Sequence, residues 1–326
     1  MHSNLNFILG RGRSGTTLLS RMLASSSSIV VTPENLFIMN MYSKYKNTIF
    51  DTVVSKQNFI NDLWLEKRVN NWGIDKTGLL KYLNNLGELS YSEICYEVYN
   101  YYALKNSSDV DSVKYLFDKN PGYSVLAKSL ISMYPSAKFI HIVRNPKDNV
   151  LSYKNVPFEP NNIIVLAYRW RFYNKFIESC KKLFPDKFIT VRYEDLVAEP
   201  ESTLRSICGF LSLPFEDEML DFYKNENTNS SQYWHKNLTS TVSSKSVNKW
   251  QSGLDETEIN SIEKICKELM LYYGYEINLN SKIDINLFNY IYLLFGFLLS
   301  VFEIFLFKLP FNLRVYIIEA YRKFNS

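Results

Sequence analysis

The chain has 326 residues, of which 46% are hydrophobic and 21% are charged, a composition that is ordinary for a globular protein with a buried core. Its formal net charge is only +4, which excludes a general electrostatic argument for nucleic-acid binding. The four cysteines show no short paired spacing, so the sequence favours reduced core cysteines over a zinc motif or a disulfide framework. We expect no bound metal.

The first elements are a strand, a glycine-rich loop and a helix. Residues 6–9 are an apolar run that predicts a buried strand, and residues 17–25 have the apolar spacing of a helix. Between them lies Gly10-Arg-Gly-Arg-Ser-Gly-Thr-Thr17, and this order is the context that a phosphate-binding loop requires. The apolar stretch before the loop is too short for a secretory signal, so we expect a cytoplasmic protein.

Short strands and helices alternate along the rest of the chain. We expect further strands at residues 29–31, 115–117, 138–143 and 187–191. We expect helices through much of 36–102 and at 163–183, 201–225 and 255–273, and a polar loop at 226–253. The alternation predicts an α/β fold, a three-layer P-loop-like domain with a central parallel sheet. Because ligands of such sheets bind beyond the carboxyl ends of the strands, we expect the motifs that follow strands to share one cleft.

The C-terminal segment differs from the rest. We expect a main domain at residues 1–278 and an apolar and amphipathic helical tail at 279–326. Residues 285–302 carry no charge, but they include two asparagines and a glycine and are marginal beside the roughly 20 apolar residues of a membrane span. Three interpretations stay open: a hairpin packed on the core or on a partner, an interfacial membrane anchor, and a true span.

The glycine-rich loop departs from an ATP-binding loop at one position. Gly10 and Gly15 bracket four residues, but Thr16 stands where the ATP-binding loop has its lysine. Enzymes that cleave ATP or GTP use that lysine, with Mg²⁺, against the charge of the β- and γ-phosphates. A sulfuryl group carries less charge, so Arg13 and the N–H groups of a helix N-terminus can suffice. A plain strand-to-helix turn is the alternative. The expected ligand-binding residues here are Gly12, Arg13, Ser14, Gly15, Thr16 and Thr17.

The loop and three later segments resemble sulfotransferases. Residues 11–19, Arg-Gly-Arg-Ser-Gly-Thr-Thr-Leu-Leu, resemble that family's 5′-phosphosulfate-binding loop. Residues 134–153 resemble its 3′-phosphate-binding strand and helix, and residues 191–197 resemble a further family block. Lys249-Trp250 resembles the late loop that folds over the nucleotide. The resemblance covers roughly residues 5–275. It implies a metal-independent transferase whose co-substrate is 3′-phosphoadenosine-5′-phosphosulfate.

The resemblance also implies roles for residues outside the loop. Arg144 and Ser152, eight residues apart after a predicted strand, would hold the 3′-phosphate of the donor with a bidentate guanidinium and a hydroxyl, and a surface ion pair is the alternative for Arg144. Tyr193 could line the adenosine site, with a core or rim tyrosine as the alternative. Lys249 could approach the nucleotide as a cation, and an exposed loop lysine is the alternative.

The acceptor side needs a group that takes a proton. Glu34, just after the second predicted strand, resembles the glutamate base of protein-tyrosine and several carbohydrate sulfotransferases, although a helix-capping role also suits it. Lys119 would stabilise charge on the bridging oxygen, with simple solvation as the alternative. No histidine stands at 118–121, where the cytosolic small-molecule branch has one. His141 reads as a core histidine, and His235 receives no role.

The acceptor itself is not written in the sequence. A hydroxyl or amine of a glycan, glycolipid, peptide or small metabolite fits, and the apolar tail favours an acceptor close to a membrane, which the tail would contact peripherally. Two other functions stay open. One is a nucleotide or small-molecule kinase, which the missing lysine opposes, and the other is a non-catalytic binding protein on the same fold.

Overall fold

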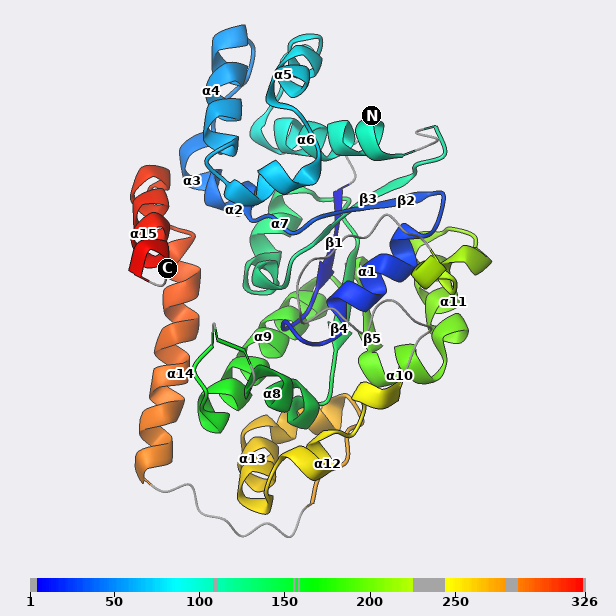
Figure 1. Cartoon of the computed structure of the whole chain (residues 1–326), viewed down its shortest axis with the longest axis vertical. Helices are drawn as coiled ribbons and strands as arrows, with labels where there is room; N and C mark the ends of the chain where they lie inside the picture. Colours follow the sequence, from blue (N-terminus) through cyan, green and yellow to red (C-terminus); the bar gives the residue numbers. More distant parts are fainter. Residues whose placement is uncertain are drawn as a thin grey trace. The chain divides into compact units, whose positions relative to one another are not determined.

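The computed structural model describes residues 5–107, 111–154, 156–157, 159–224, 244–278 and 287–324 (Figure 1). The chain forms two compact units. Unit 1 comprises the chain up to Phe7, Ser27–Ala137 and the chain from Phe302 onward. Unit 2 comprises Ile8–Ser26 and Lys138–Val301.

A parallel sheet of five strands confirms the predicted α/β class. Its strands follow the order β2-β3-β1-β4-β5. They are β1 (Leu5–Leu9), β2 (Ile29–Thr32), β3 (Tyr115–Lys119), β4 (Phe139–Val143) and β5 (Phe188–Arg192). The central strands β1 and β4 are buried along their whole length, as parallel strands covered on both faces are. All five strands lie within a residue or two of the predicted positions.

Helices flank the sheet. Those of unit 1 are α2 (Phe37–Asn40), α3 (Tyr42–Tyr45), α4 (Val53–Leu63), α5 (Lys76–Asn84), α6 (Tyr91–Asn106), α7 (Ala127–Met133) and α15 (Phe311–Phe324). Those of unit 2 are α1 (Thr16–Ala24), α8 (Pro146–Lys154), α9 (Ile163–Leu183), α10 (Tyr193–Ala198), α11 (Pro200–Leu211), α12 (Trp250–Gly253) and α13 (Glu256–Tyr272). Reciprocal capping boxes at Thr52, Ser90 and Asp255 satisfy N-terminal backbone donors of α4, α6 and α13.

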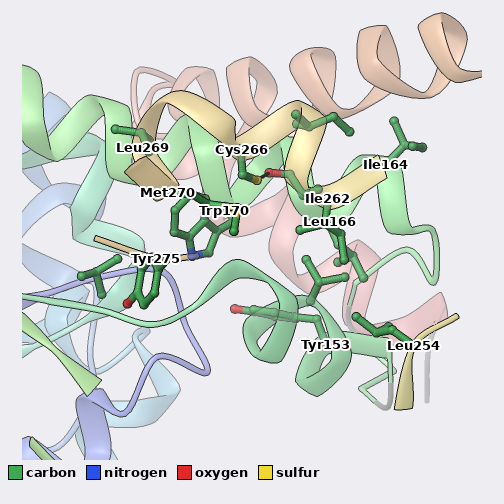
Figure 2. Close-up of a cluster of buried hydrophobic side chains, with 14 of the residues drawn as sticks. Tyr153, Ile164, Leu166, Trp170, Leu254, Ile262, Cys266, Leu269, Met270 and Tyr275 are labelled. Carbon is green, nitrogen blue, oxygen red and sulfur yellow. Dashed lines mark hydrogen bonds between the residues drawn. The ribbon is translucent and has the colours of Figure 1, made fainter. Parts of the chain in front are cut away.

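The core of unit 2 forms where α13 packs against α9 (Figure 2). Trp170 is fully buried among the side chains of this cluster, and its indole nitrogen donates to the carbonyl of Arg144 at 3.0 Å. Cys266 lies in the same cluster and donates to the carbonyl of Ala167 at 3.4 Å. All four cysteines are buried and free, as the sequence predicts.

Unit 1 buries an aromatic core of its own. The ring of Trp72 lies edge-on to the rings of Phe37 and Tyr99, with centroids 6.1 and 5.2 Å away. Phe37 and Tyr99 are fully buried and stack on each other. The aromatic residues between β2 and β3 therefore hold short helices together around the strand ends.

One predicted helix is wrong in length. The sequence predicts a helix over 201–225, but α11 ends at Leu211, and two short 3₁₀ turns follow at Asp217–Met219 and Phe222–Lys224. Ser212 adopts a left-handed conformation, with φ of 58°, and caps the helix end by donating to the carbonyl of Cys208. Pro214 then cannot continue a helical ladder.

The predicted apolar helix of the tail is present. Helix α14 runs from Leu287 to Leu306, and its segment Asn289–Leu306 has a mean hydropathy of 1.8 and is 11% buried. By length and composition this is one helix that could cross a membrane. The division at residues 278 and 279 stays a prediction.

Adjacent residues of α13 allow a matched test of the unit 2 core. Replacing buried Met270 with alanine should lower the free energy of unfolding by about 2–5 kcal/mol, because the change leaves a cavity. Leu271, which is 54% exposed on the same turn, should tolerate alanine within about 0.5 kcal/mol. Urea unfolding of both variants measures the difference, and equal losses would contradict the packing described.

Candidate active site

The glycine-rich loop joins β1 to α1 with two left-handed residues. Arg13 has φ of 63° and Gly15 has φ of 95°. A side chain at Gly15 would meet the ring of Tyr193, because a Cβ there would lie 2.3 Å from Tyr193 Cδ2. Gly15 is also the N-cap of α1, and no side-chain hydrogen bond caps this helix. A glycine at this position has no side chain that could cap the first backbone N–H groups of α1.

Arg13, Ser152 and Arg144 come together in unit 2. The Nε atom of Arg13 donates to Ser152 Oγ at 3.1 Å, and Arg144 Nη1 donates to the carbonyl of Arg13 at 3.0 Å. Burial lowers the pKa of the Arg13 guanidinium, and the nearby charge of Arg144 lowers it further. The contacts join the glycine-rich loop to the end of β4 and to helix α8 through Arg144 and Ser152, which lie 131 and 139 positions after Arg13 in the sequence.

Arg144 is buried and is held by carbonyl groups. Besides Arg13, its guanidinium donates from Nη2 to the carbonyl of Ser246 at 2.5 Å. Its Nε atom is buried without a hydrogen-bond partner in the described part of the chain. The ring of Tyr193 lies 4.8 Å from the guanidinium carbon. Carbonyl groups orient the cation without neutralising it, so Arg144 can still attract an anion.

Helix α8 also fixes the loop that carries Lys249. The carboxylate of Asp148 accepts from the backbone N–H of Asn248 at 2.8 Å and of Trp250 at 3.0 Å. The neighbouring residue Lys147 also contacts this loop, because its Nζ atom lies 3.8 Å from the centre of a ring of Trp250. The same Nζ atom pairs with the carboxylate of Glu263 at 2.8 Å. The late loop is therefore tied by its backbone to the same helix that carries Ser152.

A further contact ties α8 to the glycine-rich loop. Asn149 donates to the carbonyl of Gly12 at 2.9 Å and to Ser14 Oγ at 3.1 Å. Sequence reasoning missed Asp148 and Asn149 as site residues, although the signal was available. Both lie between Arg144 and Ser152 on the expected helix, one turn from its start.

The remaining predicted residues of unit 2 differ in exposure. Thr16 is buried and Thr17 is half-buried at the start of α1. Tyr193 is 8% exposed and packs against Gly15 and Arg144. The side chain of Lys249 is exposed. His141 is a fully buried core histidine that contacts Asn174 Oδ1 at 2.9 Å, and His235 lies outside the described residues.

In unit 1 the structure pairs Glu34 with Lys119. The register of β2 and β3 pairs Thr32 with Asp118, so Glu34 comes beside the end of β3. Glu34 Oε1 accepts from Lys119 Nζ at 2.5 Å, and Arg68 approaches Oε2 at 3.4 Å. The side chain of Glu34 is 35% exposed, whereas that of Lys119 is largely buried. A partly exposed carboxylate beside a cation can accept a proton from a bound molecule.

A side chain other than that of Glu34 bonds to the N–H at the start of α2. The N–H of Phe37, where α2 begins, donates to Asn35 Oδ1 at 2.8 Å. The side chain of Glu34 is instead drawn to Lys119 and Arg68. Arg68 lies in the 3₁₀ turn Lys67–Trp72 and has no sequence motif that could have identified it.

A buried carboxyl lies next to this pair. Asp118 is fully buried and accepts from the hydroxyl of Tyr99 at 2.6 Å. Burial raises the pKa of the Asp118 carboxyl to about 7, the bond from Tyr99 opposes the rise, and the negative charge of Glu34 adds to it.

Among the described residues, no group of three or more His, Cys, Asp or Glu side chains is arranged to hold a metal ion.

Comparison with known proteins identifies the family. A sequence profile described as the Sulfotransferase family matches residues 6–217, well over half of the chain. The chain belongs to the sulfotransferase family. The sulfotransferase domain of the Synechococcus PCC 7002 olefin synthase is 22% identical, with a TM-score of 0.61 over 85% of this chain and 97% of that domain. This likeness shows a shared fold.

The relatives found by sequence comparison are named for different sulfate acceptors. A protein-tyrosine sulfotransferase of Drosophila melanogaster is 24% identical over 222 residues, which are 66% of this chain and 39% of the relative. An omega-hydroxy-beta-dihydromenaquinone-9 sulfotransferase of Mycobacterium tuberculosis is 32% identical over 108 residues, which are 29% of this chain and 28% of the relative. The chain therefore matches well under two thirds of the length of either relative.

The tie between Asp148 and the late loop can be tested by hydrogen exchange. Replacing Asp148 with alanine removes the acceptor of two backbone N–H groups, so the amides of Asn248 and Trp250 should exchange about tenfold faster or more. An alanine at Asp195, a half-exposed carboxylate after β5, should leave these two amides unchanged. If the Asp148 variant also left them unchanged, the carboxylate would not hold the loop.

Proposed function

We propose that the protein is an enzyme that transfers a sulfuryl group from 3′-phosphoadenosine-5′-phosphosulfate to a hydroxyl or amine of an acceptor. Membership of the sulfotransferase family supports the reaction class. The observation that carries the donor assignment is the buried guanidinium of Arg144, oriented by the carbonyl groups of Arg13 and Ser246. Such a cation suits the 3′-phosphate, the group that distinguishes this donor from ATP.

The glycine-rich loop is the proposed site of the 5′-phosphosulfate. Backbone N–H groups at the start of α1 can donate to its oxygens, and Arg13 supplies the cation in place of the missing lysine. Ser152 joins Arg144 at the 3′-phosphate, and Tyr193 and Lys249 belong to the nucleotide site. The loop residues assigned to the donor are Gly12, Arg13, Ser14, Gly15, Thr16 and Thr17.

The proposed reaction is an in-line transfer. The acceptor oxygen or nitrogen attacks sulfur, the bond from sulfur to the bridging phosphate oxygen breaks, and adenosine 3′,5′-bisphosphate leaves with the electron pair of that bond. Glu34 takes the proton of the acceptor as the general base. Lys119 and Arg13 stabilise the negative charge that grows on the bridging oxygen and the sulfuryl oxygens. The 2.5 Å contact of Glu34 with Lys119 supports a base and a cation that act together.

The acceptor class is left open by this proposal. The named relatives are a protein-tyrosine and a dihydromenaquinone sulfotransferase, and a carbohydrate sulfotransferase of mouse matches 27% of this chain. A glycan, a glycolipid, a peptide tyrosine and a small metabolite all offer the required nucleophile. An acceptor panel incubated with sulfur-labelled donor identifies the class.

Replacing Glu34 with glutamine tests the base. The change keeps the shape of the side chain but removes its ability to accept a proton, so the rate of label transfer should fall by about 10²–10⁴-fold. The affinity for adenosine 3′,5′-bisphosphate, measured by calorimetry, should stay within about twofold of wild type. The same substitution at exposed Glu88 should change neither quantity.

Unchanged transfer by the Glu34→Gln protein would refute the base assignment alone. Transfer to no member of the panel, together with tight binding of the bisphosphate, would instead favour a non-catalytic binding protein on this fold.

A further inference from the structure

Helix α14 exposes a broad apolar surface. Ten of its large apolar side chains are each more than two-fifths exposed, and only 11% of the segment Asn289–Leu306 is buried. They are Tyr290, Ile291, Tyr292, Leu294, Phe295, Phe297, Leu298, Val301, Phe302 and Phe305. Soluble monomers rarely expose a contiguous apolar patch of more than a few hundred Å² without using it. This surface is therefore expected to meet an apolar partner.

A narrow stripe on the other side of α14 is attached to unit 2. A Cβ at Gly296 would lie 3.2 Å from the ring of Tyr168 in α9, so the backbone of α14 comes close to that ring. Leu293 packs against the hydrophobic cluster of Figure 2. Ser300 is 1% exposed, and its hydroxyl donates to the carbonyl of Gly296 within the helix. At 3.6 residues per turn, residues 293, 296 and 300 share one side of the helix.

The width of the exposed surface decides between two partners. At 3.6 residues per turn, the ten exposed side chains occupy more than half of the helix circumference. A second copy of α14 would cover a narrow seam, since paired helices bury a stripe of about two positions in seven. A lipid bilayer is a fluid apolar phase, so it can bury all of the exposed apolar side chains of α14 at once.

The attached stripe also decides how the helix meets lipid. Spanning the bilayer would carry the contact with Tyr168 into the hydrocarbon or break it, because the stripe and the apolar face lie on the same turns. A helix lying in the plane keeps the stripe on the protein and inserts only the opposite face, about 5–10 Å deep. Tyr290 and Tyr292 near one end and the exposed Lys308 after the other are residue types that favour the headgroup region.

We propose that α14 docks the protein on an anionic lipid bilayer, lying in the membrane plane with its exposed apolar face inserted. The docking is independent of the donor chemistry, because none of the residues involved belongs to the proposed donor or base site. Of the three interpretations of the C-terminal tail, the proposal is the interfacial membrane anchor and not a membrane-spanning helix.

Vesicle flotation of the full chain tests the docking. The protein should float with vesicles of phosphatidylcholine and phosphatidylglycerol. A triple variant with serine at Phe295, Leu298 and Phe302 should partition about tenfold less or worse, because it removes inserted apolar area. A matched triple variant, with serine at the exposed residues Ile49, Val53 and Val54 of unit 1, should float like wild type. Thermal unfolding and bisphosphate binding of both variants check that they are folded.

Three outcomes would overturn lipid docking. In the first, the wild-type chain stays in the soluble fraction. In the second, the α14 variant floats as well as wild type. In the third, the wild-type chain is a dimer, the α14 variant is a monomer, and neither protein binds vesicles. The last would assign the surface to a second copy of the chain.

The in-plane orientation has its own readout. Asn312 is exposed at the start of α15, the helix that follows α14, and the four native cysteines are buried, so a cysteine introduced by Asn312→Cys is a selective target. On protein bound to the outside of sealed vesicles, an impermeant maleimide should label this position fully. Labelling that requires detergent would show that α14 crosses the bilayer, and would contradict the orientation.

Discussion

The guanidinium of Arg144 is the interaction on which the organisation of unit 2 depends. It lies at the end of β4 and donates to the carbonyl of Arg13 in one loop and to that of Ser246 in another. The backbone carbonyl of Arg144 accepts a hydrogen bond from the indole N–H of Trp170. Because its described partners are carbonyl groups, it positions both loops and remains a cation. Burial makes such a charge expensive to leave uncompensated; the nearby carboxylate of Glu194 offsets part of this cost, and the proposed phosphate ligand would offset more.

Strand register imposes the second constraint, in unit 1. The pairing of Thr32 with Asp118 sets Glu34 beside Lys119, while the adjacent Asp118 is buried against Tyr99. Neighbouring residues of one strand thus face opposite environments, since side chains alternate across a strand. Lys119 contacts the partly exposed carboxylate of Glu34, whereas the adjacent Asp118 is buried in the aromatic core.

Much of this arrangement follows from local sequence patterns. The five strands and the glycine-rich turn lie where apolar runs and strand-end motifs predict. The bond between Arg13 and Ser152 was not predicted, because the sequence resemblance places Ser152 with Arg144. The C-terminal end of α11 was not predicted. A serine in a left-handed conformation ends this helix, and serine is a weak sequence signal for that conformation. Arg68 and Asp118 could not be assigned either. Their contacts with Glu34 and Tyr99 depend on how the helices between β2 and β3 pack, which no short motif encodes.

The central claim is that Arg144 recognises a 3′-phosphate, and a titration tests it most directly. The full chain should bind adenosine 3′,5′-bisphosphate about 100-fold more tightly than adenosine 5′-monophosphate, and Arg144→Ala should weaken binding of the bisphosphate much more than binding of the monophosphate. Equal affinity of the wild-type protein for both nucleotides, or clear binding of ATP with Mg²⁺ and none of the bisphosphate, would contradict the account.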